Sequence, residues 1–250
     1  GAFATGVGST DLAIALKTGR LWFKVPEVIK IEIKGKLPVG VMAKDIILHI
    51  LGRLKQDFAI YKAIEFNGGV VRALSMDERF VLCNMAVEMG AKTAYIQPDS
   101  STYNYLMGLG CDISVFSEYQ TDSDYIYSAK YEFDVSDLTP QVALPGSVDN
   151  VVSVSDCEGI KVDQIFVGTC TGGRLNDIRV LAEVLDGEKV SECTRLIVIP
   201  ASKRIFMEAL KKGYVEKLLK AGAVFSTPGC GPCLGAHEGV LASGERCIST

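Results

Sequence analysis

The stretch Gln164-Ile165-Phe166-Val167-Gly168-Thr169-Cys170 indicates the architecture of the C-terminal half of the chain. A short apolar run leads into a glycine and then a cysteine, which is the pattern of a strand that ends at a turn. Similar short runs that end before a turn residue occur at residues 196–199, before Pro200, and at residues 223–226, before Pro228. The sequence therefore predicts three short strands in this half.

Predicted helices separate these strands. Apolar side chains at helical spacing mark residues 175–185, Ser202 can cap a helix at 203–212, and residues 214–220 form a further short helix. Strands that alternate with helices pair as a parallel sheet through right-handed crossovers. We therefore predict an α/β fold, in which functional residues gather at the carboxyl ends of the strands.

The N-terminal half also shows predicted strands and helices, but their patterns are less clear. Residues 29–34 alternate Ile with Lys or Glu, as a half-buried strand does, and residues 43–55 carry apolar side chains at helical spacing. Residues 94–96 are a short predicted strand. Between Ser100 and Asp156 the pattern weakens into sequence rich in Ser, Asp and Tyr, which predicts a domain boundary in this region.

The composition argues against several classes of protein. The 250 residues are 48% apolar and 22% charged, values typical of a globular protein rather than a disordered or collagen-like one. Lys and Arg number 26 against 30 Asp and Glu, a net charge of −4, and no basic run offers a face for nucleic acid. We find no apolar run of membrane-spanning length and no signal-peptide pattern, so we expect no membrane partner.

The chain has eight cysteines but only two histidines. It does not resemble the short, cysteine-dense scaffolds of secreted proteins, so we expect reduced thiols and a cytoplasmic location. Any single cysteine is most simply a buried packing residue. Only Cys230-Gly231-Pro232-Cys233 stands out by its spacing, and both this pair and Cys170 follow predicted strands. His49 has no second ligand four residues away, so we interpret it as structural.

Three interpretations of these thiols remain open on spacing alone. The Cys230–Cys233 pair has the spacing of a thioredoxin-type redox motif, but too few residues follow it to complete that fold. A zinc site could use Cys170, Cys230, Cys233 and His237. An iron–sulfur cluster with three thiolate ligands would leave one iron open, and an open iron is a Lewis acid suited to hydrating or dehydrating a hydroxy acid.

A polar pair on a predicted helix could serve such an iron. Ser75 and Glu78 form a capping box, which starts a helix that ends at Gly90. Asn84 and Glu88 are four residues apart on this helix, and so share a face beside its apolar stripe. The pattern alone allows two interpretations, a solvated face or a pair that faces metal-bound water.

Three motifs in order along the chain resemble those of the aconitase superfamily. Residues 167–177 resemble its first cysteine segment, and residues 228–237 resemble its second. Residues 83–91, Cys-Asn-Met-Ala-Val-Glu-Met-Gly-Ala, are similar to a family helix that carries an Asn and a Glu, and residues 1–11 resemble the stretch after its Asp-Ser-His-Thr motif. The form of these motifs here is similar to that of isopropylmalate dehydratase and homoaconitase large subunits of the archaeal type.

The resemblance implies aconitase-like three-layer α/β/α domains with parallel sheets, and cluster cysteines at the carboxyl ends of strands. It implies that Cys170, Cys230 and Cys233 bind a [4Fe–4S] cluster with one open iron, and that Asn84 and Glu88 are catalytic residues beside it. The implied activity is a hydro-lyase that interconverts 2-isopropylmalate and 3-isopropylmalate by dehydration and rehydration, in leucine biosynthesis. Homoaconitase and citramalate or dimethylmalate dehydratases are alternatives, and a non-catalytic iron–sulfur or zinc-binding protein is a more distant one.

The resemblance also implies a domain organisation. Residues 1–25 are expected to be the tail of an incomplete first domain, residues 26–148 a second domain that carries the Asn and the Glu, and residues 149–250 a third that carries the cluster cysteines. The expected partners are a separate small subunit, which is the swivelling domain of the family, and a small hydroxy-diacid substrate. We expect an interior piece of a longer subunit, which is inactive alone.

Two positions depart from the family's usual residues. Gly172 stands where the family usually has Asn, and Thr169 stands where it usually has Ser. These departures from the family pattern bear on the assignment of the substrate more than on the cluster.

Overall fold

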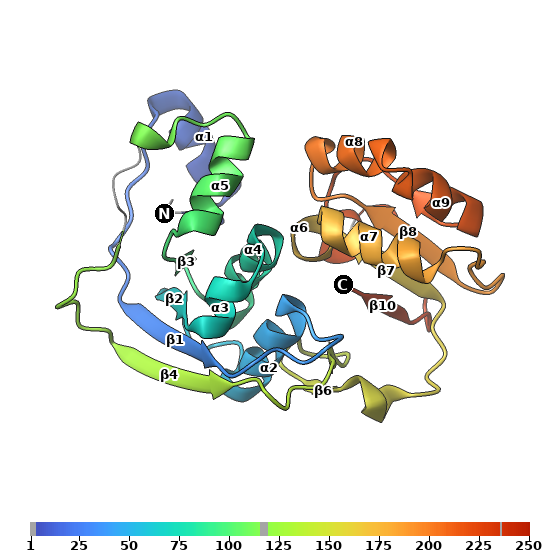
Figure 1. Ribbon diagram of the computed structural model, residues 1–250, viewed down its shortest axis with the longest axis horizontal. Coiled ribbons are helices and arrows are strands. Elements are labelled where there is room, and N and C mark those ends of the chain that lie inside the picture. The colour runs from blue at the N-terminus through green and yellow to red at the C-terminus, as the bar shows by residue number, and fades with distance from the viewer. Residues whose placement is uncertain (1–3, 116–119, 236) are drawn as a thin grey trace. The chain divides into compact units, whose positions relative to one another are not determined.

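The computed structural model describes residues 4–115, 120–235 and 237–250. Residues 1–3 and Ala236, which belong to two of the motifs above, lie outside the described residues. The chain divides into two compact units, Gly1–Val154 and Ser155–Thr250, and each contains a four-stranded parallel sheet (Figure 1). The predicted α/β class with parallel sheets is confirmed. The division into domains at residues 25 and 148 stays a prediction.

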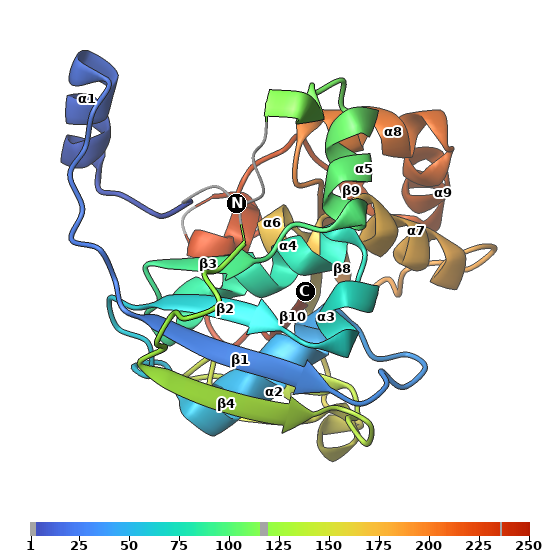
Figure 2. The same cartoon turned by 60° about the vertical axis from the view of Figure 1, so that its left-hand side comes forward.

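The sheet of the first unit has the strand order β3-β2-β1-β4, with every neighbouring pair parallel, and Figure 2 shows β2, β1 and β4 side by side. A small antiparallel hairpin, β5-β6, completes the unit. The elements of this unit are α1 (Ser9–Thr18), β1 (Val28–Lys34), α2 (Ala43–Leu54), β2 (Ala63–Asn67), α3 (Gly69–Ala73), α4 (Met76–Met85), the 3-10 helix η1 (Ala86–Met89), β3 (Thr93–Ile96), α5 (Ser100–Gly108), the 3-10 helix η2 (Ile113–Val115), β4 (Ala129–Asp134), β5 (Gln141–Ala143) and β6 (Val151–Ser153).

The core of the first unit is formed by this sheet together with α2, α3 and α4. The isoleucines of β1 at positions 29, 31 and 33 are almost completely buried, while the Lys and Glu residues between them are not. They pack with the apolar stripe of α2, which includes Ile46 and Ile50. The alternation of period two and the helical spacing read from the sequence are both confirmed.

The sequence analysis did not predict two strands of this sheet, β2 and β4. Residues 63–66 of β2 are all buried, so this strand shows no alternation to mark it. The strand β4 does alternate, with Ala129, Tyr131 and Phe133 on the less exposed side. It lies in the stretch interpreted as a domain boundary, yet Tyr131 is paired with Ile31 of β1, so this part of the stretch belongs to the first unit.

The sheet of the second unit has the strand order β10-β7-β8-β9, again with every pair parallel. The predicted strands and helices are confirmed, and the Ser202 hydroxyl caps α8 by accepting a hydrogen bond from the Ile205 amide (3.3 Å). The elements are η3 (Val154–Cys157), which begins at the end of the first unit, β7 (Gln164–Gly168), α6 (Thr169–Gly172), α7 (Leu175–Val184), β8 (Arg195–Ile199), α8 (Lys203–Lys211), α9 (Tyr214–Ala221), β9 (Val224–Phe225), the 3-10 helix η4 (Gly231–Leu234) and β10 (Cys247–Ser249).

The structure offers no transmembrane helix within its described part. Over residues 4–115, 120–235 and 237–250, none of the helices combines the length and the apolar character that crossing a bilayer requires.

Candidate functional site

The first cysteine segment is a sharp turn from a strand into a helix. β7 ends at Gly168, and Thr169 then adopts a left-handed backbone conformation with φ +67°. The turn leaves the Cys170 thiol exposed at the carboxyl end of the sheet, while the Thr169 side chain is only 6% exposed. The predicted position of Cys170 after a parallel strand is confirmed.

Glycines on either side of Cys170 allow this turn to pack tightly. A β-carbon on Gly168 would lie 2.8 Å from the Ile199 carbonyl oxygen, and one on Gly173 would lie 2.5 Å from the same atom. A β-carbon on Gly172 would overlap the side chain of Thr250, whose hydroxyl oxygen accepts a hydrogen bond from the Gly168 amide (3.1 Å). The absence of a side chain at residue 172 therefore has a packing reason.

The second cysteine segment follows β9, on the other side of β8. Cys230 and Cys233 belong to one tight turn, in which the Cys233 amide donates to the Cys230 carbonyl oxygen (3.1 Å). Gly231 between them has φ +52°, and a β-carbon there would overlap the side chain of Ile199. Both cysteine segments thus pack against Ile199, the last residue of β8. No pattern in the sequence indicates this shared contact.

The arrangement of the thiols bears on what they can bind. Cys170, Cys230 and Cys233 are all exposed, and no disulfide joins any of the eight cysteines. Within the described ranges, no three His, Cys, Asp or Glu side chains are gathered closely enough to hold one metal ion. A single zinc ion would need its thiolate sulfurs within about 4 Å of one another, because each Zn–S bond is about 2.3 Å long. A cubane cluster binds each thiolate to a different iron, and therefore fits ligands on separate turns better.

The other predicted site residues belong to the first unit. The Ser75 capping box is confirmed: its hydroxyl oxygen accepts from the Glu78 amide (3.4 Å), and the Glu78 carboxylate accepts from the Ser75 amide (3.0 Å). The α-helix ends at Met85, however, and continues as the 3-10 helix η1 up to Gly90. This tighter turn lies between Asn84 and Glu88, so the four-residue spacing no longer shows that they share a face.

The turn that carries Glu88 lies at the amino ends of β2 and β3. The Met89 carbonyl oxygen accepts a hydrogen bond from the Ala59 amide (2.8 Å), just before β2 begins. Glu88 is exposed and Asn84 is partly buried. The structure therefore brings Cys170, Cys230 and Cys233 into one unit, at the carboxyl edge of its sheet, while Asn84 and Glu88 occupy the other unit.

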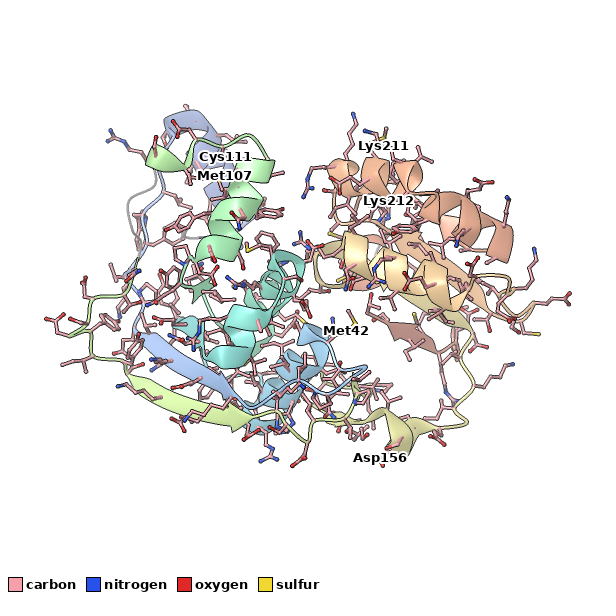
Figure 3. All side chains as sticks on the ribbon, in the orientation of Figure 1. Met42, Met107, Cys111, Asp156, Lys211 and Lys212 are labelled. Atoms are coloured by element: carbon pink, nitrogen blue, oxygen red, sulfur yellow. The ribbon has the colours of Figure 1, made fainter. Side chains whose placement is uncertain are left out.

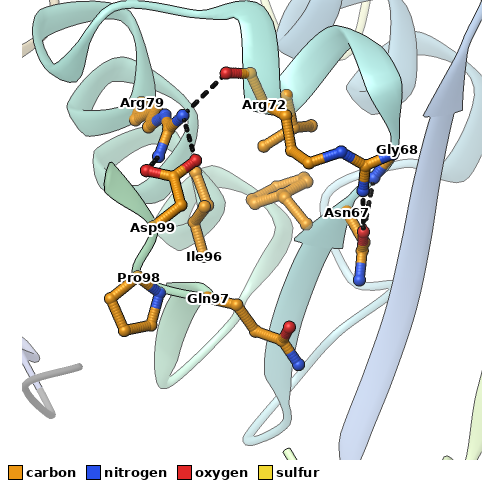
Figure 4. Close-up of a pocket in the computed structure, with 10 residues that line it drawn as sticks. Asn67, Gly68, Arg72, Arg79, Ile96, Gln97, Pro98 and Asp99 are labelled. Atoms are coloured by element: carbon orange, nitrogen blue, oxygen red, sulfur yellow. Dashed lines mark hydrogen bonds and ion pairs between the residues drawn. The ribbon is translucent and has the colours of Figure 1, made fainter. Parts of the chain in front are cut away.

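The first unit also has a cavity of about 90 Å³ at the carboxyl ends of β2 and β3 (Figure 4). Arg79, one of its lining residues, is buried and forms a two-point ion pair with Asp99 (2.7 and 2.8 Å). The Arg79 hydrogen bonds lower the pKa of Asp99. The exposed Arg72 contacts the Asn67 side-chain oxygen (3.3 Å). The Arg79–Asp99 pair joins α4 to the start of α5, which is a structural role.

The remaining cysteines do not all pack in the core. Cys83 is partly buried, and burial raises the pKa of its thiol to about 12. Cys157 and Cys247 are also partly buried, and burial raises the pKa of Cys247. Cys111, which follows α5 (Figure 3), and Cys193 are exposed, so the expectation of a packing role is wrong for these two. Each lies in a loop rather than in a strand or an α-helix.

The two histidines have different surroundings. His49 is partly buried on α2, its ring meets the edge of the Phe133 ring at 6.0 Å, and burial lowers its pKa. These contacts agree with a structural role. His237 is exposed and lies 3.9 Å from the Glu238 carboxylate.

Comparison with known proteins identifies the relatives of this chain. The model of the aconitase family (aconitate hydratase) matches residues 1–158 and 155–250. The 3-isopropylmalate dehydratase large subunit 1 of Methanopyrus kandleri is 52% identical over 250 residues, which cover all of this chain and 59% of that protein. The probable methanogen homoaconitase large subunit of Methanosarcina mazei is 49% identical, over all of this chain and 63% of that protein.

The chain thus spans about three fifths of the length of these relatives. Among solved structures, the aconitase X of Thermococcus kodakaraensis matches 85% of this chain and 47% of its own, with a TM-score of 0.48 and 14% identity. That likeness is too weak to add to the assignment. Because the family model covers the whole sequence, the chain belongs to the aconitase family.

Proposed function

We propose that this chain is the cluster-binding part of a hydro-lyase large subunit that interconverts 2-isopropylmalate and 3-isopropylmalate by dehydration and rehydration. One observation carries the proposal: the turn with Cys170 and the turn with Cys230 and Cys233 follow parallel strands and pack against the same residue, Ile199. Members of the family carry iron–sulfur clusters, and three exposed thiols are a suitable ligand set for one.

In this proposal Cys170, Cys230 and Cys233 hold a [4Fe–4S] cluster with one open iron. When bound, the cluster supplies a Lewis acid that can polarise a hydroxyl group of the substrate. Since all three thiols are already exposed, no cysteine has to leave the core to become a ligand. Soft thiolates are also the ligands that such clusters prefer.

Asn84 and Glu88 complete the proposed machinery from the first unit. When protonated, the exposed Glu88 carboxyl group can donate a proton to the substrate hydroxyl, which then leaves as water; in the reverse step the Glu88 carboxylate takes a proton back from the adding water. The Asn84 amide can donate a hydrogen bond to a substrate oxygen. These roles need both residues to face the substrate in the assembled enzyme.

Homoaconitase is the second candidate, because the probable homoaconitase large subunit is nearly as similar to this chain as the isopropylmalate dehydratase subunit is. In either case the named large subunits imply a small-subunit partner, which we propose for this protein as well. The substrate is then a small hydroxy-diacid. We also propose a cytoplasmic location, where thiols stay reduced.

The test uses the complete large subunit with its small subunit, reconstituted anaerobically with iron and sulfide. We expect cluster absorbance in the visible range and turnover of isopropylmalate, with homocitrate and citramalate assayed in parallel. Bound zinc without iron or sulfide would refute the cluster, and failure to hydrate any of the corresponding alkene diacids would refute the enzyme.

Variants separate the proposed roles. Cys233→Ser should prevent stable cluster assembly, while Cys193→Ser, at another exposed cysteine, should assemble it normally. Glu88→Gln should keep the cluster and lose about 10²- to 10⁴-fold in turnover, the usual contribution of a general acid or base. A fully active Glu88→Gln enzyme would exclude the role given to Glu88.

A further inference from the structure

Thr169 is held in a conformation that its side chain disfavours. Its φ of +67° lies in the left-handed region, where β-branched residues are genuine outliers. Among residues 4–115, 120–235 and 237–250, the other non-glycine residues with positive φ are Lys55 and Tyr61, and neither is β-branched. A strained residue directly before Cys170 therefore calls for a physical reason.

The surroundings of Thr169 fix it in this state. The Gly173 amide donates a hydrogen bond to the Thr169 carbonyl oxygen (3.0 Å), which closes the turn. Just before Thr169, the Gly168 amide donates a hydrogen bond to the Thr250 hydroxyl oxygen (3.1 Å). A β-carbon on Gly173 would lie 2.8 Å from the Thr169 nitrogen, so the two ends of the turn are in close contact. Strain persists only where neighbouring contacts enforce it in this way.

The direction of the chain shows what the strain achieves. β7 ends at the carboxyl edge of the sheet, and the left-handed conformation of Thr169 then turns the backbone into α6. As a result the Thr169 side chain is buried while its neighbour Cys170 is exposed. An ordinary extended or right-handed conformation at residue 169 would give the turn a different course and move Cys170.

We propose that Thr169 is a positioning residue: its enforced left-handed backbone holds the Cys170 thiol exposed at the carboxyl edge of the sheet, where it can bind a cluster, before any cofactor is present. This inference rests on the proposed function, because it takes Cys170 as a cluster ligand. Residues that orient metal ligands typically change metal affinity 10- to 100-fold when they are replaced. We therefore expect loss of this turn to weaken retention of the cluster rather than the stability of the fold.

The experiment compares three variants of the complete large subunit. Thr169→Gly permits positive φ without strain but also permits other conformations. Thr169→Asn keeps a side chain that tolerates the left-handed region, and so preserves the turn. Thr171→Gly, two residues along, adds the same flexibility at a position without positive φ, and serves as the matched control for stability.

Two readouts are measured: the thermal midpoint of the cluster-free protein, and the rate at which the reconstituted protein loses its visible absorbance to an iron chelator. Thr169→Gly should unfold at a higher temperature than Thr171→Gly, because strain relief offsets the cost of a glycine. It should lose its cluster about 10-fold faster than the wild type, and Thr169→Asn should restore the wild-type rate.

Loss of the cluster from Thr169→Gly at the wild-type rate would overturn the positioning role. Equal midpoints for the two glycine variants would overturn the claim of strain. Both outcomes differ from failure of the proposed function, in which the wild-type protein itself would take up no cluster.

Discussion

Replacing Gly172 with alanine tests whether the turn around Cys170 is built by packing against the last strand. A β-carbon at residue 172 would overlap the hydroxyl oxygen and the β-carbon of Thr250, and would lie 3.1 Å from the Thr250 carbonyl carbon. Because the backbone of Thr250 is part of the obstruction, a change of rotamer cannot remove it.

The expected cost has two parts. Forcing an extra methyl group into a filled space typically costs about 1–3 kcal/mol. Displacing Thr250 also breaks its hydrogen bond with the Gly168 amide, which contributes about 1 kcal/mol. We therefore expect Gly172→Ala to destabilise the second unit by about 2–4 kcal/mol.

Hydrogen exchange of the β7 and β8 amides reports on the stability of the second unit, because both strands belong to it. A loss of about 2.8 kcal/mol corresponds to roughly 100-fold faster exchange. The matched control is Gly229→Ala, where the nearest atom to a new β-carbon is 3.9 Å away and φ is not positive. It should change exchange by less than about 0.5 kcal/mol, as neutral surface substitutions do.

A double variant completes the test. Thr250→Gly removes the side chain that Gly172→Ala would meet, so the two substitutions together should cost less than the sum of their separate effects, by about 1 kcal/mol or more. The reasoning fails if Gly172→Ala exchanges no faster than Gly229→Ala, or if the effects of Gly172→Ala and Thr250→Gly are simply additive.

Three further predictions concern the first unit. Asp99→Ala leaves the buried Arg79 guanidinium without its ion pair, and should destabilise the unit by about 3 kcal/mol. Hydrogen exchange of the β2 and β3 amides measures this loss, and exchange at the wild-type rate would contradict it. Cys83 should resist alkylation at pH 8 while the exposed Cys193 reacts. Burial raises its folded-state pKa from the ordinary value of 9.0 to about 12, so its contribution to stability is complete below pH 9 and is lost progressively as the pH rises from 9 to about 12. Equal alkylation rates for Cys83 and Cys193 would contradict the raised pKa. Ser75→Ala should cost about 1 kcal/mol through loss of the α4 cap, and unchanged exchange in α4 would show that the cap contributes nothing.

Local signals in the sequence were sufficient for much of the fold. The alternation along β1 and the capping box at Ser75 depend on neighbouring residues only, and both are confirmed. β2 was missed because burial on both faces removes the alternation, and the end of α4 at Met85 was missed because a 3-10 turn keeps an apolar pattern similar to that of a helix. The exposure of Cys111 was missed as well, because composition does not distinguish a loop cysteine from a core cysteine.

The sequence by itself determined that Cys170 and the Cys230–Cys233 pair follow parallel strands, because a strand–turn pattern is local and helix-linked strands run in one direction. Only the tertiary structure decided that both segments pack against Ile199, that Thr250 takes the space beside Gly172, and that Thr169 is forced into a left-handed conformation. These features arise from contacts between residues up to 82 positions apart, such as Gly168 and Thr250. No local pattern can encode them, since they depend on which strands become neighbours once the sheet has formed.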